Sequence, residues 1–151
     1  MIIHSTRMGD IEINDEDIFR FPHGLPGFPD ERSFVMLVYE SGIPFYLLQS
    51  TITPELTFVL ADPFEFFDDY HVKLDDEIIS ELGLSNDNYP HIYAIVTIPD
   101  DIKNMTANLI APVIINLKTK TGVQVILEKT VYTTRHRLFV FNLPQDNARK
   151  E

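Results

Sequence analysis

Short apolar runs with a period of two, broken repeatedly by turn residues, limit this chain to a β fold. In residues 8–13, Ile11 and Ile13 alternate with Asp10 and Glu12, as on a strand with one buried face. The other runs are rich in β-branched and aromatic residues and end at Gly, Pro, Asn or Asp. Strands are predicted over residues 8–13, 33–39, 45–49, 57–61, 92–98, 113–117 and 123–127.

Eight to ten short strands with turn signals this frequent are typical of a closed β-barrel or a sandwich. At 151 residues the chain suits one domain. The predicted fold class is therefore mainly β: a single compact barrel-like or sandwich domain of short antiparallel strands, with one or two short helices. The domain is expected over residues 1–138, and the polar end, residues 139–151, is expected to be a partly disordered tail.

Two positions carry specific backbone predictions. Pro112 interrupts the apolar run 107–114, and because proline cannot donate to a strand ladder, it should mark an edge, a bulge or a strand end. Residues 118–122 are typical of a hairpin loop in which Gly122 can adopt a positive φ.

One helix is predicted over residues 74–83. Asp75 is suited to the N-cap, and Asp76 and Glu77 suit the positive end of the helix dipole. Gly83 is suited to the position just after the last turn. With about two turns, this helix is expected to be an addition to a β framework.

Composition excludes several classes of protein. The chain has no cysteine, which excludes disulfides, thiolate zinc sites and cysteine nucleophiles. No window approaches the roughly 18 apolar residues that a membrane span requires. The first residues also lack the basic and apolar regions of a secretory signal, so a soluble, cytoplasmic protein is expected.

Negative charge is concentrated in the middle of the sequence. The whole chain has a net charge of −11, and residues 62–101 carry 11 acidic side chains against Lys73 alone. This sign disfavours nucleic acids and anionic membranes and suits a basic protein partner. The alternative interpretation is a solvated acidic face without a partner.

Catalytic and metal-binding patterns are missing from the sequence. The five histidines are isolated, and only His71 lies next to carboxylates, Asp68 and Asp69. There is no G-x-S-x-G turn, and the glycines of residues 24–27 lack the spacing and lysine of a phosphate loop. We therefore predict no enzyme, no cofactor and no metal, while an orphan hydrolase and a small nucleic-acid-binding barrel remain as weaker alternatives.

Two segments combine aromatic residues with unusual neighbours. Residues 21–28 hold two prolines, two glycines and two phenylalanines, which predicts a rigid pair of turns anchored in the core at each end. Residues 62–70 form an acidic loop with four aromatic side chains. These aromatics could be contact residues for a protein partner or a plug of the core.

Taken together, these motifs resemble the FliW family of flagellar assembly factors over roughly residues 1–138. The resemblance rests on an ordered set of segments, of which A-N-L-x-A-P-x-x-x-N is the most specific. They are Phe21–Phe28, Leu48-Gln49-Ser50, Asp62-Pro63 with Asp69-Tyr70, Ala107–Asn116 and Gln124–Leu127. Pro29 departs from the family pattern, in which an acidic or polar residue is more usual.

The resemblance implies a non-enzymatic regulator that is expected to be a monomer when free. Family members bind CsrA, an RNA-binding translational repressor, away from its RNA surface, and thereby relieve repression of flagellin mRNA. They also bind flagellin, which titrates them away from CsrA. The alternative is a small acidic β-barrel that serves as an interaction or chaperone-like module unrelated to CsrA.

We expect two partner-binding surfaces in this chain. The first is the acidic loop and helix start, and the second is the strand interrupted by Pro112, where a free edge could accept an extended segment. In the second surface, the alternative is that the two asparagine amides cap neighbouring strand ends. The candidate residues are Phe66, Asp68, Asp69, Tyr70, Asp75, Asp76, Glu77, Asn108, Pro112 and Asn116.

Overall fold

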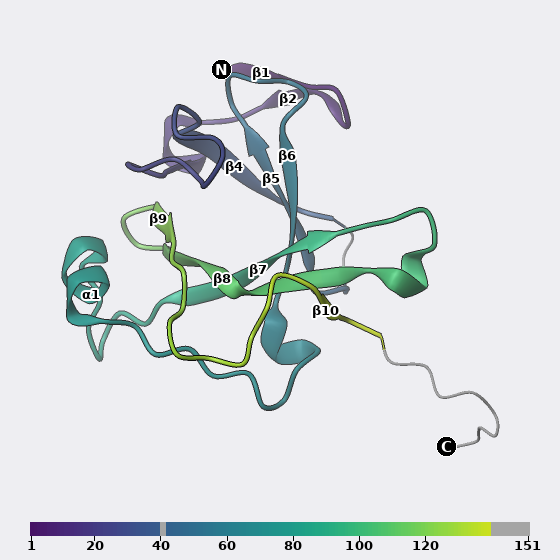
Figure 1. The fold of residues 1–151 in the computed structure, drawn as a ribbon. Coiled ribbons are helices and arrows are strands. Elements are labelled where there is room, and N and C mark those ends of the chain that lie inside the picture. The colour runs from purple at the N-terminus through teal and green to yellow at the C-terminus, as the bar shows by residue number, and fades with distance from the viewer. Residues whose placement is uncertain (40–41, 140–151) are drawn as a thin grey trace.

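The computed structural model describes residues 1–39 and 42–139 of the chain (Figure 1). Its strands are β1 (Ile2–Ser5), β2 (Gly9–Glu12), β3 (Ile18–Arg20), β4 (Ser33–Val38), β5 (Phe45–Ser50), β6 (Thr57–Ala61), β7 (His91–Thr97), β8 (Thr106–Asn116), β9 (Thr121–Gln124) and β10 (His136–Arg137). The helices are α1 (Asp76–Leu82) and three short 3-10 turns, η1 (Asp15–Asp17), η2 (Pro63–Glu65) and η3 (Ile102–Asn104). Except for Phe139, the predicted tail lies outside the described residues. No helix in the described part is long and apolar enough to cross a membrane.

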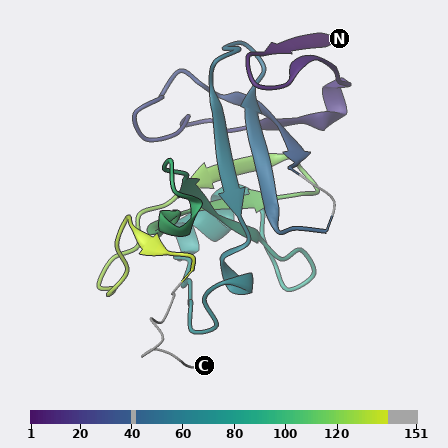
Figure 2. The same ribbon diagram turned by 90° about the vertical axis from the view of Figure 1, so that its right-hand side faces the viewer.

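Seven strands close into a barrel. The order is β8-β7-β6-β5-β4-β3-β9, and β9 also pairs with β8, so the ring returns to its start. All pairings are antiparallel except β3 with β9, which run parallel at Arg20 and Thr121. Figure 2 shows the blue strands of the N-terminal half crossing in front of the green strands of the C-terminal half. The predicted mainly β, barrel-like class is confirmed, with this one parallel pairing as a departure.

One hydrophobic cluster fills the barrel interior. Alternate residues of the strands contribute to it, as the period of two predicts. Its fully buried members include Phe34 of β4, Leu48 of β5 and Leu60 of β6. Phe21 packs edge-on against Phe34, with 5.4 Å between ring centroids.

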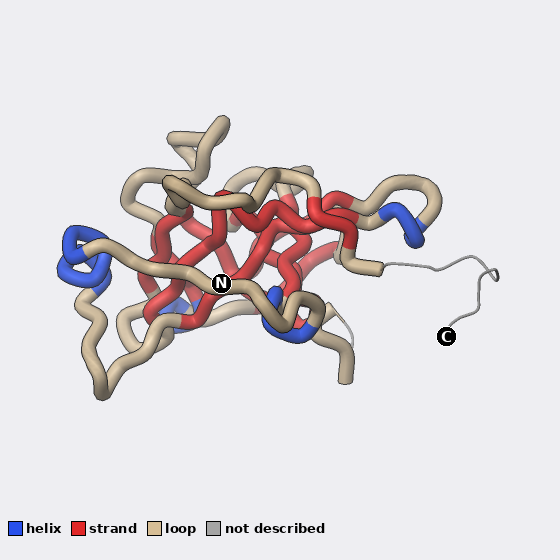
Figure 3. Tube along the Cα trace, turned by 60° about the horizontal axis from the view of Figure 1, so that its bottom comes forward, coloured by secondary structure: helices blue, strands red, loops and turns tan. Residues whose placement is uncertain are grey.

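Three further clusters cover the outer face of the barrel. The β1–β2 hairpin covers Ile18 and Val35, and α1 covers Ile114 and Val123. A third cluster lies beneath the loop after β6 and the segment leading to β10. Figure 3 shows the red strands in the centre of the molecule, with the blue helices and tan loops around them. Hydrophobic residues on the outward faces of the strands thus pack against separate surface segments.

The helix prediction is confirmed in its boundaries. The Asp75 carboxylate accepts a hydrogen bond from the Ile78 N–H at 2.9 Å, and α1 begins at Asp76. Gly83 ends the helix in the left-handed region, at φ 67°.

Pro112 lies in a large bulge of β8, which confirms one of the three sequence interpretations. Tyr93 pairs with Val113 and Ile95 with Asn108, so residues 109–112 stand opposite Ala94. The expectation of a free edge is wrong. β8 pairs with β7 on one side and with β9 and β10 on the other, and residues 125–133 cover the stretch between those two.

The hairpin loop before β9 differs from the prediction at one point. The positive φ is found at Lys120, at 57°, and not at Gly122. Gly122 is instead required by packing, because a Cβ atom there would lie 2.7 Å from Cε2 and Cζ of Phe21. The ring of Phe21 occupies the space that a side chain would need, at the strand that closes the barrel.

The buried side chain of Gln49 in β5 links β1 to the turn between β5 and β6 and to the start of β6. The Gln49 carbonyl accepts hydrogen bonds from Ser5 and Thr57, and its amide donates to the carbonyls of Ser50, Thr53 and Pro54. Gln49 is fully buried, and each of its polar atoms has a partner. The Leu48-Gln49-Ser50 motif is therefore part of the framework.

The Gly122→Ala substitution tests the closure of the barrel. We expect it to lower the free energy of unfolding by about 1–3 kcal/mol, because the new methyl group overlaps the Phe21 ring. Urea denaturation measures this change. Phe21→Leu should relieve the overlap, so the double variant should lose less stability than the sum of the single variants. Strictly additive losses would contradict the steric explanation.

Candidate protein-binding site

A groove lies on the outside of the barrel between two extended segments. Residues 71–75, with the first turn of α1, form one wall, and residues 125–132 form the other. In Figure 1 these are the teal segment leading into α1 and the yellow-green segment between β9 and β10, at the bottom left of the molecule. The groove has a volume of about 690 Å³. This α1 groove is large enough to receive part of a polypeptide.

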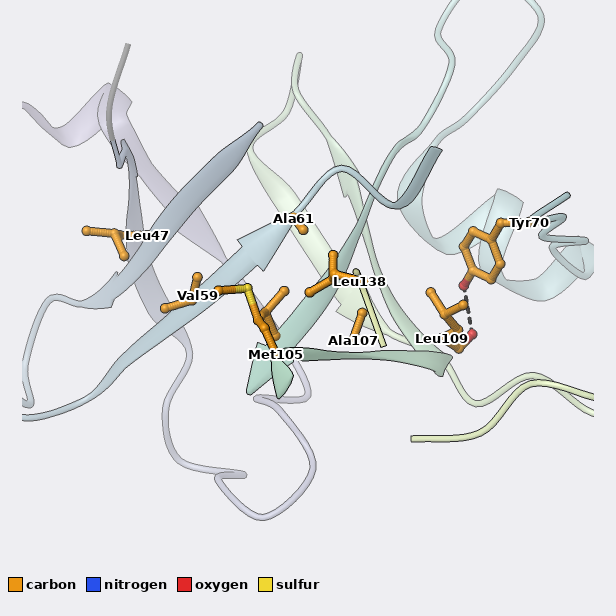
Figure 4. Close-up of a cluster of buried hydrophobic side chains, with 10 residues drawn as sticks. Leu47, Val59, Ala61, Tyr70, Met105, Ala107, Leu109 and Leu138 are labelled. Atoms are coloured by element: carbon orange, nitrogen blue, oxygen red, sulfur yellow. Dashed lines mark hydrogen bonds between the residues drawn. The ribbon is translucent and has the colours of Figure 1, made fainter. Parts of the chain in front are cut away.

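Two tyrosines fix the walls relative to the barrel. The Tyr132 hydroxyl donates to the Asp69 carbonyl at 3.3 Å and accepts from the His71 N–H at 2.9 Å. Its ring packs edge-on against Tyr70, with 4.8 Å between centroids. Tyr70 in turn donates to the Leu109 carbonyl at 2.7 Å, as Figure 4 shows. The two walls, 61 residues apart at His71 and Tyr132, are thereby joined to β8.

Five of the predicted site residues are brought to one side of this groove. Asp75 lines the groove, and Asp76 and Glu77 follow it in the first turn of α1. Asp68 and Asp69 precede the loop wall, next to the Tyr132 contact. All five side chains are exposed. The five carboxylates are therefore exposed on the segment that leads into and begins α1, which we call the rim of the groove, and their contact with a partner stays a prediction.

The aromatic residues of the acidic loop pack mainly onto the barrel. Phe66 is half-buried between Phe45 and Phe139, at centroid distances of 5.5 and 6.0 Å. Phe67 packs into the same cluster, and Phe64 remains 46% exposed. Of the two interpretations of this loop, the core plug agrees with the structure for all but Phe64.

Three predicted contact residues are buried, which corrects their placement on a partner surface. Tyr70 is 6% exposed, and Pro112 is enclosed in the bulge of β8. The fully buried Asn116 donates to the Leu82 carbonyl at 2.6 Å and accepts from the N–H groups of Lys118 and Thr119. Sequence alone could not tell that these polar groups bond inward.

Asn108 is half-buried and also has a local role. Its side-chain oxygen accepts from the Ala111 N–H at 3.0 Å inside the bulge. Both asparagines thus bond backbone groups of the framework, as the capping interpretation expected in general terms, but at a bulge, a helix end and a turn rather than at neighbouring strand ends. The second predicted surface, strand addition along residues 108–116, has no free edge in this structure.

Within the part of the chain that the structure describes, no three His, Asp or Glu side chains are grouped to hold a metal ion. His71 lines the groove, and its backbone N–H donates a hydrogen bond to the Tyr132 hydroxyl. The arrangement offers charge, apolar surface and backbone groups. These are the means of binding a polypeptide.

Sequence reasoning missed the second wall of the groove. Residues 123–127 were predicted as a strand of the barrel, but β9 ends at Gln124. The apolar run over residues 123–127 is typical of a strand, and only the structure shows that Ile126 and Val131 are 67% and 87% exposed.

Burial of two phenols gives the stability of the protein a defined pH dependence. Burial raises the pKa of Tyr70, with a further contribution from Tyr132, and raises the pKa of Tyr93 to about 12. In the unfolded chain both phenols titrate near 10. Above that pH the unfolded chain binds fewer protons than the folded one, so the free energy of unfolding should fall as pH rises.

We expect Tyr70→Phe and Tyr93→Phe each to make this decline shallower, by up to about 1.4 kcal/mol per pH unit. Urea denaturation above about pH 10 measures the slope. Tyr89→Phe, at a side chain that is 71% exposed, is the matched control. An unchanged slope in both core variants would contradict the assignment.

Asn116→Ala tests whether this amide has a framework role. Its removal leaves the buried Leu82 carbonyl and the N–H groups of residues 118 and 119 without partners, so the free energy of unfolding should fall by about 2 kcal/mol. Asn86→Ala, at an exposed position, should change little. Thermal and urea denaturation compare the two. Equal stability of both variants would contradict the role.

Comparison with known proteins gives consistent matches over the described domain. The family model of the FliW protein matches residues 2–138. The flagellar assembly factor FliW of Desulfitobacterium hafniense is 47% identical over 139 residues, which cover 92% of this chain and 91% of that protein. The flagellar assembly factor FliW of Geobacillus kaustophilus is also 47% identical over 139 residues, covering 92% and 96%. A crystal structure of the flagellar assembly factor FliW superposes with a TM-score of 0.88 at 44% identity, covering 93% of this chain and 99% of that one.

Proposed function

The chain belongs to the FliW family, and from this premise we propose that it is a flagellar assembly factor that binds CsrA and antagonises it allosterically. In this proposal the bound protein favours the RNA-free form of the repressor and so relieves repression of flagellin mRNA. Flagellin binds the same factor and titrates it away from CsrA. The factor acts without catalysis, as a monomer in the cytoplasm, where the repressor meets its mRNA.

The observation that carries this proposal is the acidic rim of the α1 groove. Asp68, Asp69, Asp75, Asp76 and Glu77 are exposed along a stretch of ten residues, and Lys73 is the only cation among them. A basic, RNA-binding dimer is attracted by such a surface. An acidic body docked beside a basic RNA groove also lowers the potential that attracts phosphates. This gives the antagonism a physical cause without contact at the RNA surface.

The five-carboxylate variant tests this account. Asp68, Asp69, Asp75 and Asp76→Asn with Glu77→Gln removes five charges and keeps side chains that can still cap α1. We expect the association rate constant with CsrA to fall by roughly tenfold at low salt and to depend less steeply on salt. Displacement of a flagellin leader RNA should weaken in parallel. Surface plasmon resonance and an RNA mobility-shift competition measure the two effects.

A charge-matched variant provides the control. Glu12→Gln with Asp15, Asp30, Asp87 and Asp100→Asn removes the same number of charges at exposed positions away from the groove rim. It should bind CsrA faster than the five-carboxylate variant. Equal behaviour of the two would sink the local electrostatic account, whereas failure of the wild-type protein to bind either CsrA or flagellin would sink the proposed function. In the latter case the fold would be that of an acidic interaction module unrelated to CsrA.

A further inference from the structure

Residues 125–128 extend β9 with one of their two edges open. Val125 N–H donates to the Pro112 carbonyl at 3.1 Å, and Leu127 N–H donates to the Ile110 carbonyl at 2.7 Å. In an antiparallel pair the intervening residues direct their backbone groups to the opposite side. Ile126 and Glu128 therefore point their N–H and C=O groups away from β8. Among the described residues, neither group donates or accepts a backbone hydrogen bond at these two positions.

Pro112 explains why the regular strand stops at Gln124 while the chain remains extended. Proline has no N–H, so it cannot return a hydrogen bond to the Val125 carbonyl. The next donor on β8, the Ile110 N–H, is directed to the Thr133 carbonyl at 3.2 Å. Residues 125–128 are thus held to β8 by single bonds. Lys129, at φ 54°, then turns the chain.

The open edge borders the α1 groove, and apolar side chains lie along it. Leu74 and Ile78 line the wall opposite Val125. Ile126 and Val131, exposed at 67% and 87%, present aliphatic surface next to the groove. An added strand would find both backbone partners and an apolar strip.

The charges around the groove indicate the sign of the occupant. Those that line it balance, with Lys73 and Lys129 against Asp75 and Glu128. The excess is supplied by the rim, where Asp68, Asp69, Asp76 and Glu77 are exposed. A segment with basic side chains complements this rim.

We propose that the open edge of residues 125–128 binds an extended, proline-free segment of a protein partner by β-strand addition, with apolar side chains toward Leu74 and Ile78 and basic ones toward the rim. This rests on the proposed function for the identity of the partner, and it assigns the docking mode. The segment that the sequence analysis placed at residues 108–116 is covered by residues 125–133. The free edge lies one strand further on.

Amide hydrogen exchange on the full chain tests the docking mode directly. The probe is a capped decapeptide of alternating valine and lysine, followed by two-dimensional NMR. We expect the exchange rates of the Ile126 and Glu128 amides to fall by about tenfold or more when the peptide is bound, because these amides become hydrogen-bond donors. The Val125 and Leu127 amides are already bonded to β8 and serve as internal references. Unchanged exchange at residues 126 and 128 with bound peptide would overturn the proposal.

Two matched changes separate backbone pairing from charge attraction. A decapeptide of alternating proline and lysine has the same charge and half the donors, and it should bind about tenfold more weakly. In the protein, Ile126→Pro removes an outward N–H and leaves both donors to β8, whereas Ile126→Val keeps the N–H. We expect only the proline variant to lose peptide affinity, and equal affinities for both peptides would also overturn the proposal.

The same exchange measurement with purified flagellin and purified CsrA separates this inference from the proposed function. Protection of residues 126 and 128 by either protein supports the inference. If both proteins bind and neither protects these amides, the inference fails and the proposed function stands. If the valine–lysine peptide protects them and neither protein binds, the docking mode stands and the proposed function fails.

Discussion

Closure of the barrel by β9 is the constraint on which the rest of the structure depends. β9 has only four residues, and it must pair with β8 along its length and with β3 at Arg20, whose N–H donates to the Lys120 carbonyl. The Phe21 ring lies against Gly122 at a distance that leaves no room for a side chain. The same ring packs on Phe34 in the interior. A glycine in a closing strand thus allows a large aromatic to fill the barrel where its two halves meet.

The irregularity of β8 determines what lies beyond this closure. Four residues bulge opposite Ala94, and the proline among them has no N–H for the neighbouring strand. β9 therefore loses its regular pairing after Gln124, and the chain continues as a singly bonded extended segment that becomes one wall of the α1 groove. Pro112, a buried residue of the framework, accordingly shapes the exposed groove wall, which it contacts through its carbonyl at Val125. This gives a physical reason for a proline in the A-N-L-x-A-P-x-x-x-N segment that is independent of any partner contact.

The sequence was sufficient for features that depend on local patterns. The strands at 33–38, 45–50 and 57–61 and the caps of α1 agree with the periodicity and the capping residues, because each is determined within a few neighbouring positions. Features that depend on distant partners were not accessible. The inward hydrogen bonds of Tyr70 and Asn116 join residues 39 and 34 positions apart, and the contact that makes Gly122 obligatory involves Phe21. Short strands such as β3 and β10 exist through pairing and carry little pattern of their own.

The candidate site joins one feature that is local in sequence with one that is not. Its acidic rim comes from a single stretch of the chain, so counting charges was enough to find it. The opposite wall comes from residues 125–132, and it reaches the rim through the hydrogen bonds of Tyr132 and the ring contact with Tyr70. Both walls are extended segments outside the barrel, which keeps its own closed hydrogen-bond ring. The barrel closes without hydrogen bonds from these segments, so the groove is an addition to the framework, held to it by Tyr70, Tyr132 and the apolar packing of Leu74 and Ile78.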